Sequence, residues 1–128
     1  MHISEIFDHH RPSFSLEFFP PQTNGASERL YRTILRLEKL KPSFVSVTYG
    51  ADGSTRELTH DLVERIHTST TLDPIPHLTC VCHREDEIRV ILARYAAAGI
   101  SNVLTLGGDP PPRSTRPRPV AGRVSACR

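Results

Sequence analysis

Two spacings of hydrophobic residues alternate along the first 109 residues. Four segments rich in strand-forming or alternating residues are predicted as strands: residues 13–19, 44–48, 75–81 and 102–106. Three segments between them place apolar side chains every three or four positions and are predicted as helices: residues 28–41, 55–67 and 88–98. The pattern therefore predicts the order βαβαβαβ, in which helices cross over between parallel strands.

The ends of the predicted helices carry local signals. Ser27 is placed as the N-cap of the first helix, and Pro42 ends it. Ser54 and Glu57 have the spacing of a capping box at the second helix. Gly99 is placed where the third helix needs a left-handed residue at its carboxyl end.

The length of the repeat favours a barrel. Glu17, Thr48, His77 and Leu106 follow one another at intervals of about 30 residues, close to the unit of an eight-fold barrel of about 250 residues. An open doubly wound sheet has similar spacing, but the turn at residues 19–23 lacks a glycine-rich phosphate fingerprint. We therefore predict an α/β chain of the (β/α)8 TIM-barrel class with about four βα units.

Composition changes this picture only at the end of the chain. Hydrophobic residues make up 38% and charged residues 23%, as in soluble globular proteins. Residues 110–128 contain five arginines and no acidic residue and are interrupted by prolines. We predict one domain over residues 1–109 and a disordered Pro/Arg-rich tail over 110–128. A nucleic-acid-binding arm is the alternative, but no reader fold accompanies it, so no nucleic acid is expected.

Location and metal binding follow from simple absences in the sequence. No apolar run is long enough to span a membrane, and the start lacks a signal-peptide pattern, so we expect a cytoplasmic protein without a membrane partner. The odd number of cysteines favours reduced thiols. On an extended strand His77 faces opposite to Cys80 and Cys82, so we expect no metal site.

Candidate chemistry lies where strands end, because barrels place their sites at the carboxyl ends of the strands. Glu17 lies between Leu16 and Phe18 and is expected to be poorly solvated, which suits a carboxyl group that acts as a general acid. A salt-bridged or solvent-facing glutamate is the equal alternative. His77 suits either a cofactor contact or a core histidine, and residues 107–109 suit either close ligand approach or an ordinary turn.

Four motifs taken together resemble the methylenetetrahydrofolate reductase family in order and spacing. They are Leu16-Glu17-Phe18-Phe19-Pro20-Pro21, Phe44-Val45-Ser46-Val47-Thr48-Tyr49-Gly50-Ala51, Pro76-His77-Leu78-Thr79-Cys80 and Gly107-Gly108-Asp109-Pro110. The resemblance implies a barrel that binds FAD, which NADH or NADPH reduces. The flavin then passes a hydride to 5,10-methylenetetrahydrofolate, giving 5-methyltetrahydrofolate for methionine biosynthesis.

The resemblance also assigns roles to residues. Glu17 matches the acid that opens the folate imidazolidine ring, and Asp109 matches the aspartate near flavin and folate that stabilises the cationic iminium. The implied cofactor-binding residues are Thr48, Tyr49, Ala51, His77, Gly107, Gly108 and Asp109, with Thr48 also near the nicotinamide. Gly107 stands where the family pattern has arginine, so a bidentate donor is missing there.

The chain is short for a complete member of this family. The family's catalytic domain is about twice as long as this chain, consistent with the size of a full barrel. We therefore expect the amino-terminal half of the barrel, with the tail from Pro110 as a premature end, either a real product or the result of a frameshift. The full-length family is expected to form homo-oligomers, and the alternative for this chain is an inactive truncated fragment that associates without catalysis.

Overall fold

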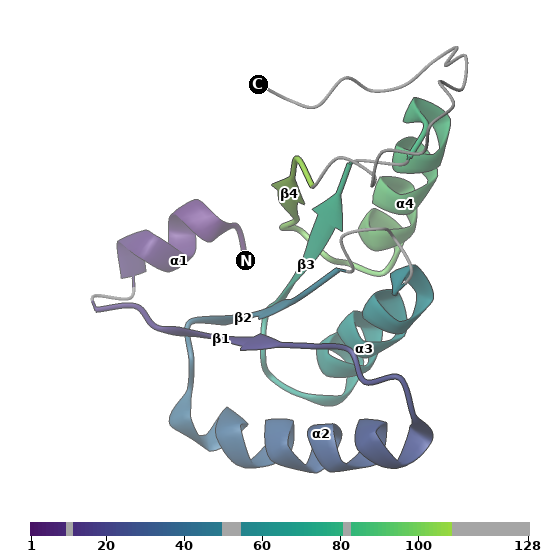
Figure 1. Ribbon diagram of the computed structural model, residues 1–128. Helices are drawn as coiled ribbons and strands as arrows, with labels where there is room; N and C mark the ends of the chain where they lie inside the picture. Colours follow the sequence, from purple (N-terminus) through teal and green to yellow (C-terminus); the bar gives the residue numbers. More distant parts are fainter. Residues whose placement is uncertain (10–11, 50–54, 81–82, 109–128) are drawn as a thin grey trace.

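The computed structural model describes residues 1–9, 12–49, 55–80 and 83–108. Along the chain the elements are α1 (Ile3–His9), β1 (Ser15–Phe18), α2 (Asn24–Leu37), a 3-10 helix η1 (Glu38–Leu40), β2 (Phe44–Val47), α3 (Arg56–Ser69), β3 (Pro74–Thr79), α4 (Glu85–Ala97) and β4 (Leu104–Leu106). The four strands form one parallel sheet in the order β1-β2-β3-β4. In Figure 1, α2, α3 and α4 lie on one side of the sheet, and α1 lies apart on the other.

This arrangement confirms the predicted alternation of strands and helices and fits part of a barrel of the TIM class. Consecutive strands are neighbours, as crossover helices require. The pairing is also staggered, because β3 pairs with β2 through residues 74–76 and with β4 through residues 77–79. Such an offset is expected where strands tilt around a barrel axis.

The main hydrophobic core lies between the sheet and α2, α3 and α4. Val45 and Val47 point from β2 into this core, and both are 0% exposed. Val63 and Ile66 of α3 meet them with no exposed surface, and Ile34 contributes from α2. Burying each such side chain is worth about 1.5–3 kcal/mol, so this side supplies most of the hydrophobic stabilisation.

The start of α2 differs from the prediction. The N-cap is Thr23 rather than Ser27, because the Thr23 hydroxyl accepts a hydrogen bond from the Ala26 amide at 3.3 Å. Ser27 therefore lies inside the first turn. At the other end the chain tightens into η1 and leaves it through Lys41, whose φ of 52° is left-handed, directly before Pro42.

The other two predicted helices are also displaced at their ends. The N-cap of α3 is Thr55, and Ser54 lies outside the described residues. Helix α4 begins at Glu85, three residues before the expected start. Its end confirms the prediction, since Gly99 has a φ of 79° and its amide donates to the Ala96 carbonyl oxygen at 3.0 Å.

Helix α1 was not predicted, and tertiary contacts explain why it forms. Isolated helices of this length are unstable in water. Here Ile6 is 1% exposed, and Asn102, which precedes β4, accepts a hydrogen bond from the Ile3 amide at 2.9 Å. The Met1 amino group lies 3.1 Å from the Asp73 carboxylate, just before β3. These contacts hold α1 near the amino ends of the strands.

Two further predictions concern membrane-spanning segments and the tail of the chain. No helix of the described residues is long and apolar enough to cross a membrane. Residues 109–128 lie outside the described part, and so do the predicted tail and the boundary before it.

Candidate functional site

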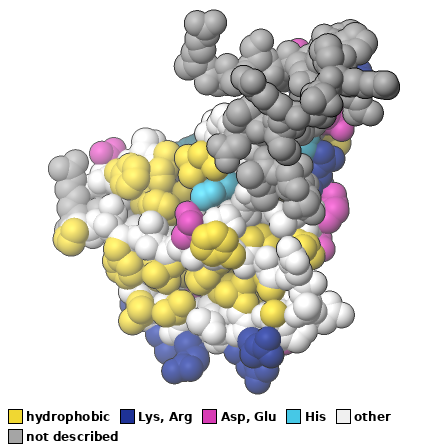
Figure 2. All heavy atoms as spheres, in the orientation of Figure 1, with side chains coloured by type: hydrophobic (Ala, Val, Ile, Leu, Met, Phe, Trp, Pro, Cys, Tyr) yellow, Lys and Arg dark blue, Asp and Glu magenta, His cyan; other side chains and the backbone are white. Residues whose placement is uncertain are grey.

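The sheet face opposite the main core carries the candidate chemistry, and we call it the inner face. Alternation along β1, β2 and β3 places Glu17, Ser46 and His77 on this face. They lie at a cavity of about 610 Å³ between α1 and the sheet, whose other lining residues are Ile3, Phe7, Ser15, Phe44, Ile75, Ser101, Asn102, Val103 and Leu104. Figure 2 shows yellow hydrophobic side chains around a histidine and an acidic side chain on this side of the molecule.

Glu17 is accessible, which corrects the expectation that it is poorly solvated. Its side chain is 50% exposed, because it projects from the inner face while the flanking Leu16 and Phe18 project toward the helices. The Ser46 hydroxyl donates to its carboxylate at 3.4 Å, and His77 Nε2 lies 3.6 Å from the same oxygen. The carboxylate is therefore oriented by neighbours yet open to a ligand.

His77 is buried and holds an unused polar atom. The residue is 7% exposed, and its Nε2 makes no hydrogen bond within the described residues. Burial lowers the pKa of His77, and the nearby charge of Glu17 opposes this effect only in part. The imidazole is therefore neutral at pH 7, and its distance from Glu17 is too long for a hydrogen bond. A ligand group at the inner face would satisfy the orphaned nitrogen.

Thr48 and Tyr49 leave the carboxyl end of β2, as the sequence predicted. Two hydrogen bonds of 2.9 Å hold the backbone of Thr48. Its amide donates to the Phe18 carbonyl oxygen, and its carbonyl oxygen accepts from the Thr59 hydroxyl. Tyr49 is 7% exposed, and burial raises the pKa of its hydroxyl, although the hydrogen bond from Arg56 opposes this. The loop that follows, including Ala51, lies outside the described residues.

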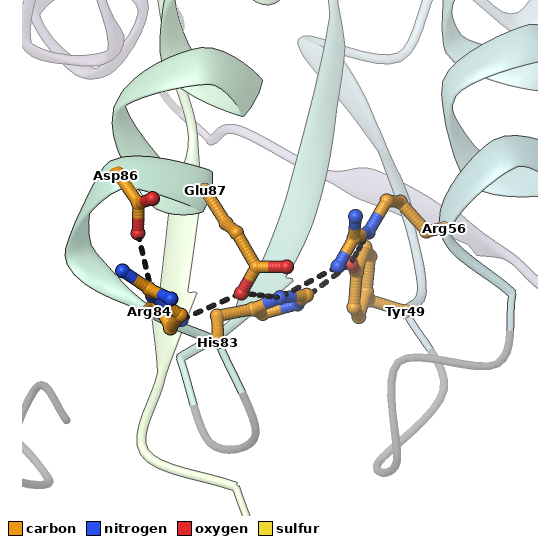
Figure 3. Close-up of polar contacts among 6 residues, drawn as sticks. All are labelled: Tyr49, Arg56, His83, Arg84, Asp86 and Glu87. Atoms are coloured by element: carbon orange, nitrogen blue, oxygen red, sulfur yellow. Dashed lines mark hydrogen bonds and ion pairs between the residues drawn. The ribbon is translucent and has the colours of Figure 1, made fainter. Parts of the chain in front are cut away.

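Tyr49 belongs to a second polar cluster that the sequence did not predict (Figure 3). Its Oη lies 2.9 Å from His83 Nε2 and accepts a hydrogen bond from Arg56 Nε at 3.3 Å. Arg56 also reaches His83 Nδ1 at 2.7 Å. No sequence motif marks this cluster, because the three residues come from the end of β2, the start of α3 and the segment before α4.

The glycines after β4 form the last described part of the predicted site. Gly108 has a φ of 77°, which a residue with a side chain rarely adopts. Among the described residues, a Cβ added at Gly107 would meet no atom within 4 Å. The next residue, Asp109, lies outside the described residues, so its predicted role stays a prediction.

The structure therefore brings the site residues into two clusters. The first joins Glu17, Ser46 and His77 across three strands. The second holds Tyr49 beyond the end of β2. Across the described ranges no three His, Cys, Asp or Glu residues are grouped to hold a metal ion. The first cluster suits proton transfer and ligand contact, and the second suits rigid placement of a hydroxyl group.

Fold and site define an α/β chain of the TIM-barrel class with polar residues on its inner face. Comparison with known families is more specific, because the family model described as "Methylenetetrahydrofolate reductase" matches residues 2–126. The chain therefore belongs to the methylenetetrahydrofolate reductase family.

Individual relatives support this assignment. A 5,10-methylenetetrahydrofolate reductase of Escherichia coli (strain K12) is 46% identical over 103 residues, covering 80% of this chain and 35% of the relative. The corresponding protein of Pectobacterium carotovorum is 42% identical over 107 residues, covering 84% and 36%. A methylenetetrahydrofolate reductase (NADH) 1 of Arabidopsis thaliana is 37% identical over 109 residues, covering 85% and 18%. The matched part spans about a third of the length of the bacterial relatives.

Proposed function

We propose that this chain contributes to a flavin-dependent oxidoreductase that reduces 5,10-methylenetetrahydrofolate to 5-methyltetrahydrofolate, with NADH or NADPH as reductant. Family membership and the printed names of the relatives support the substrate. The observation that carries the proposal is the placement of Glu17, half exposed on the inner face between the Ser46 hydroxyl and the His77 imidazole. Cytoplasmic location and homo-oligomerisation rest on the sequence and the resemblance alone.

Two observations on the described residues support FAD as the cofactor. The orphaned His77 Nε2 is a polar atom that a ligand group could pair with at the inner face, and the absence of a side chain at Gly107 would let a ligand approach the backbone. Thr48, Tyr49 and Gly108 would complete the described part of the binding site, together with Ala51 and Asp109. When bound, the flavin supplies the hydride-transfer chemistry.

Glu17 is proposed as the proton donor. Glu17 would transfer a proton to a ring nitrogen of the folate, which would open the imidazolidine ring and leave the methylene carbon electrophilic. The Ser46 hydroxyl holds the carboxyl group in one orientation, and its exposure lets the substrate reach it. Asp109 is proposed to stabilise the positive charge on the opened substrate.

The test combines binding and activity. The chain is incubated with excess FAD, freed of unbound ligand and examined by flavin absorbance and thermal unfolding, followed by an assay of folate reduction with NADH and NADPH. We expect bound flavin and a cooperative transition. Glu17→Gln should retain flavin and lose folate reduction by about 10²–10⁴-fold, the size of a general-acid contribution.

Glu85→Gln is the matched control, because Glu85 is an exposed carboxylate paired with Arg89 on α4, remote from the inner face. It should leave activity unchanged. A chain that folds without binding FAD, or a Glu17→Gln variant as active as the wild type, would contradict the proposal. An associating chain without flavin would instead support the non-catalytic alternative.

A further inference from the structure

Glu17 has two carboxyl oxygens, and the structure distinguishes between them. The Ser46 hydroxyl donates to Oε2 at 3.4 Å, and His77 Nε2 lies 3.6 Å from the same oxygen. Ser46 is 8% exposed and His77 7%, whereas the Glu17 side chain is 50% exposed. Oε2 is therefore the oxygen held against the protein. No hydrogen bond of the described residues involves Oε1, which leaves Oε1 for a ligand.

The position of the proton on His77 follows from the atom opposite its buried nitrogen. Burial lowers the pKa of His77, so the ring is neutral at pH 7 and carries one N–H, with a lone pair on its other nitrogen. Nε2 makes no hydrogen bond within the described residues and lies opposite Glu17 Oε2. A lone pair on Nε2 would meet the lone pairs of that oxygen, whereas an N–H would meet an acceptor. The contact therefore favours the Nε2–H tautomer.

The separation of 3.6 Å is longer than a hydrogen bond, as catalytic contacts often are before a substrate binds. If Glu17 gave its proton to the folate from Oε1, the O–H bond would break, an N–H bond would form on the ring nitrogen, and the electron pair would stay on the carboxylate. The negative charge would spread over both oxygens and make Oε2 a stronger acceptor. The contact between Nε2 and Oε2 would then shorten into a hydrogen bond.

We propose that His77, as the Nε2–H tautomer, is a positioning residue that donates a hydrogen bond to Glu17 Oε2 while Glu17 releases its proton from Oε1. This inference deepens the proposed function and rests on it, since it takes Glu17 as the proton donor. The hydrogen bond forms only as charge develops, so its loss lowers kcat and leaves KM unchanged. Any contact of His77 with FAD is then left to the other atoms of the ring.

The tautomer is tested without cofactor or substrate. In protein labelled with ¹⁵N-histidine, the ring resonances of His77, assigned by their loss in His77→Gln, should show a protonated Nε2 and an unprotonated Nδ1 at pH 7. A proton on Nδ1 in the wild-type protein would overturn the inference.

The positioning role is tested by a matched pair of variants. The amide nitrogen of Gln can take the place of Nε2, whereas that of Asn is one bond shorter and reaches only the place of Nδ1. His77→Asn should lower kcat for folate reduction about 10- to 100-fold, the range for one hydrogen bond to a charged group, with KM unchanged. His77→Gln should recover most of this loss. The two variants should bind FAD equally well.

Two controls show whether the effect passes through Glu17. In a Glu17→Gln background no carboxylate forms at position 17, so His77→Asn and His77→Gln should have the same residual rate. His67→Asn changes a histidine in the last turn of α3, on the other side of the sheet, and should leave kcat unchanged. Thermal unfolding of each variant shows whether a loss of rate reflects a loss of folded protein.

The outcomes separate the two proposals. If His77→Asn raises the Kd for FAD or the KM for the folate above that of His77→Gln while kcat is the same, Nε2 contacts a ligand directly. That result, or a difference that persists in the Glu17→Gln background, would overturn the positioning role and leave the proposed function standing. A folded, flavin-bound wild-type chain that does not reduce the folate would overturn the proposed function and the role of His77 in it, while the NMR measurement still decides the tautomer.

Discussion

The two faces of the sheet have opposite characters. On the helix-covered face Val45 and Val47 are 0% exposed and meet apolar side chains. On the inner face Glu17 is half exposed and Leu104 is 44% exposed beside a cavity. Neighbouring residues of a strand point to opposite faces, so the difference between the faces corresponds to an alternation from one residue to the next in the sequence.

This contrast shows where stability and chemistry reside. Bulky branched side chains normally fill the interior of a TIM barrel, and the helix-covered face is packed in that manner here. The inner face instead interleaves hydrophobic residues with Ser46, His77 and Thr79. Polar groups on a face that packing alone would fill with apolar residues indicate a ligand site. The following predictions probe the contrast, beginning with the largest expected effect on stability.

Ile66→Ala on the helix-covered face should cost about 2–5 kcal/mol of the free energy of unfolding, because it removes a fully buried side chain and leaves a cavity. Leu104→Ala is the control on the inner face and should cost far less, since Leu104 is already 44% exposed. Urea unfolding at one temperature measures both variants. Equal losses would show that the inner face is packed as tightly as the core.

The sequence predicted the helix-covered sheet better than the elements that depend on contacts between distant parts of the chain. Hydrophobic spacing was sufficient to predict the strands and the crossover helices, and the helix-capping rule to predict the left-handed Gly99, because these depend on local sequence and on burial of one face. It missed α1, whose stability depends on contacts with Asp73 and Asn102, which are more than 70 residues away in the sequence. It also misplaced the N-cap of α2, because several hydroxyl and amide side chains lie together before that helix.

The candidate site was predictable only in part for a related reason. Glu17 and His77 were identified as residues of one site, and the structure places them 3.6 Å apart. The expected desolvation of Glu17 was wrong because its hydrophobic sequence neighbours point to the opposite face. Arg56 and His83 carry no motif, and only the crossover topology brings them to Tyr49.

The next prediction concerns how the stability of the fold depends on pH, through histidines on both faces of the sheet. Burial lowers the pKa of three histidines below 6.5: His60 against the core, His77 on the inner face and His83 beside Arg56. The unfolded chain then binds more protons than the folded chain as the pH falls below 6.5. The stabilisation is complete above this value and is lost progressively on acidification. The urea midpoint should therefore fall between about pH 7 and pH 5.

Carboxylates do not account for this range, because hydrogen bonds lower the pKa of Glu38 and Glu57 below 4.5, where their own contribution is lost. A variant carrying His60→Gln and His83→Gln should show a weaker fall in midpoint over the same interval. An unchanged pH dependence in this variant would assign the effect to other groups.

The smallest predicted effect tests whether α1 is a structural cover of the inner face. Phe7 of α1 makes an edge-to-face contact with Phe44 of β2, with ring centroids 6.1 Å apart, although it is 48% exposed. Phe14 is similarly exposed, at 47%, and lies before β1. Phe7→Ala should lower the free energy of unfolding more than Phe14→Ala by about 0.5–1.5 kcal/mol, the value of one aromatic pair. In a Phe44→Leu background this difference should disappear, whereas a difference that persists would mean that α1 is held by Ile6 and its polar contacts and that the aromatic pair contributes little.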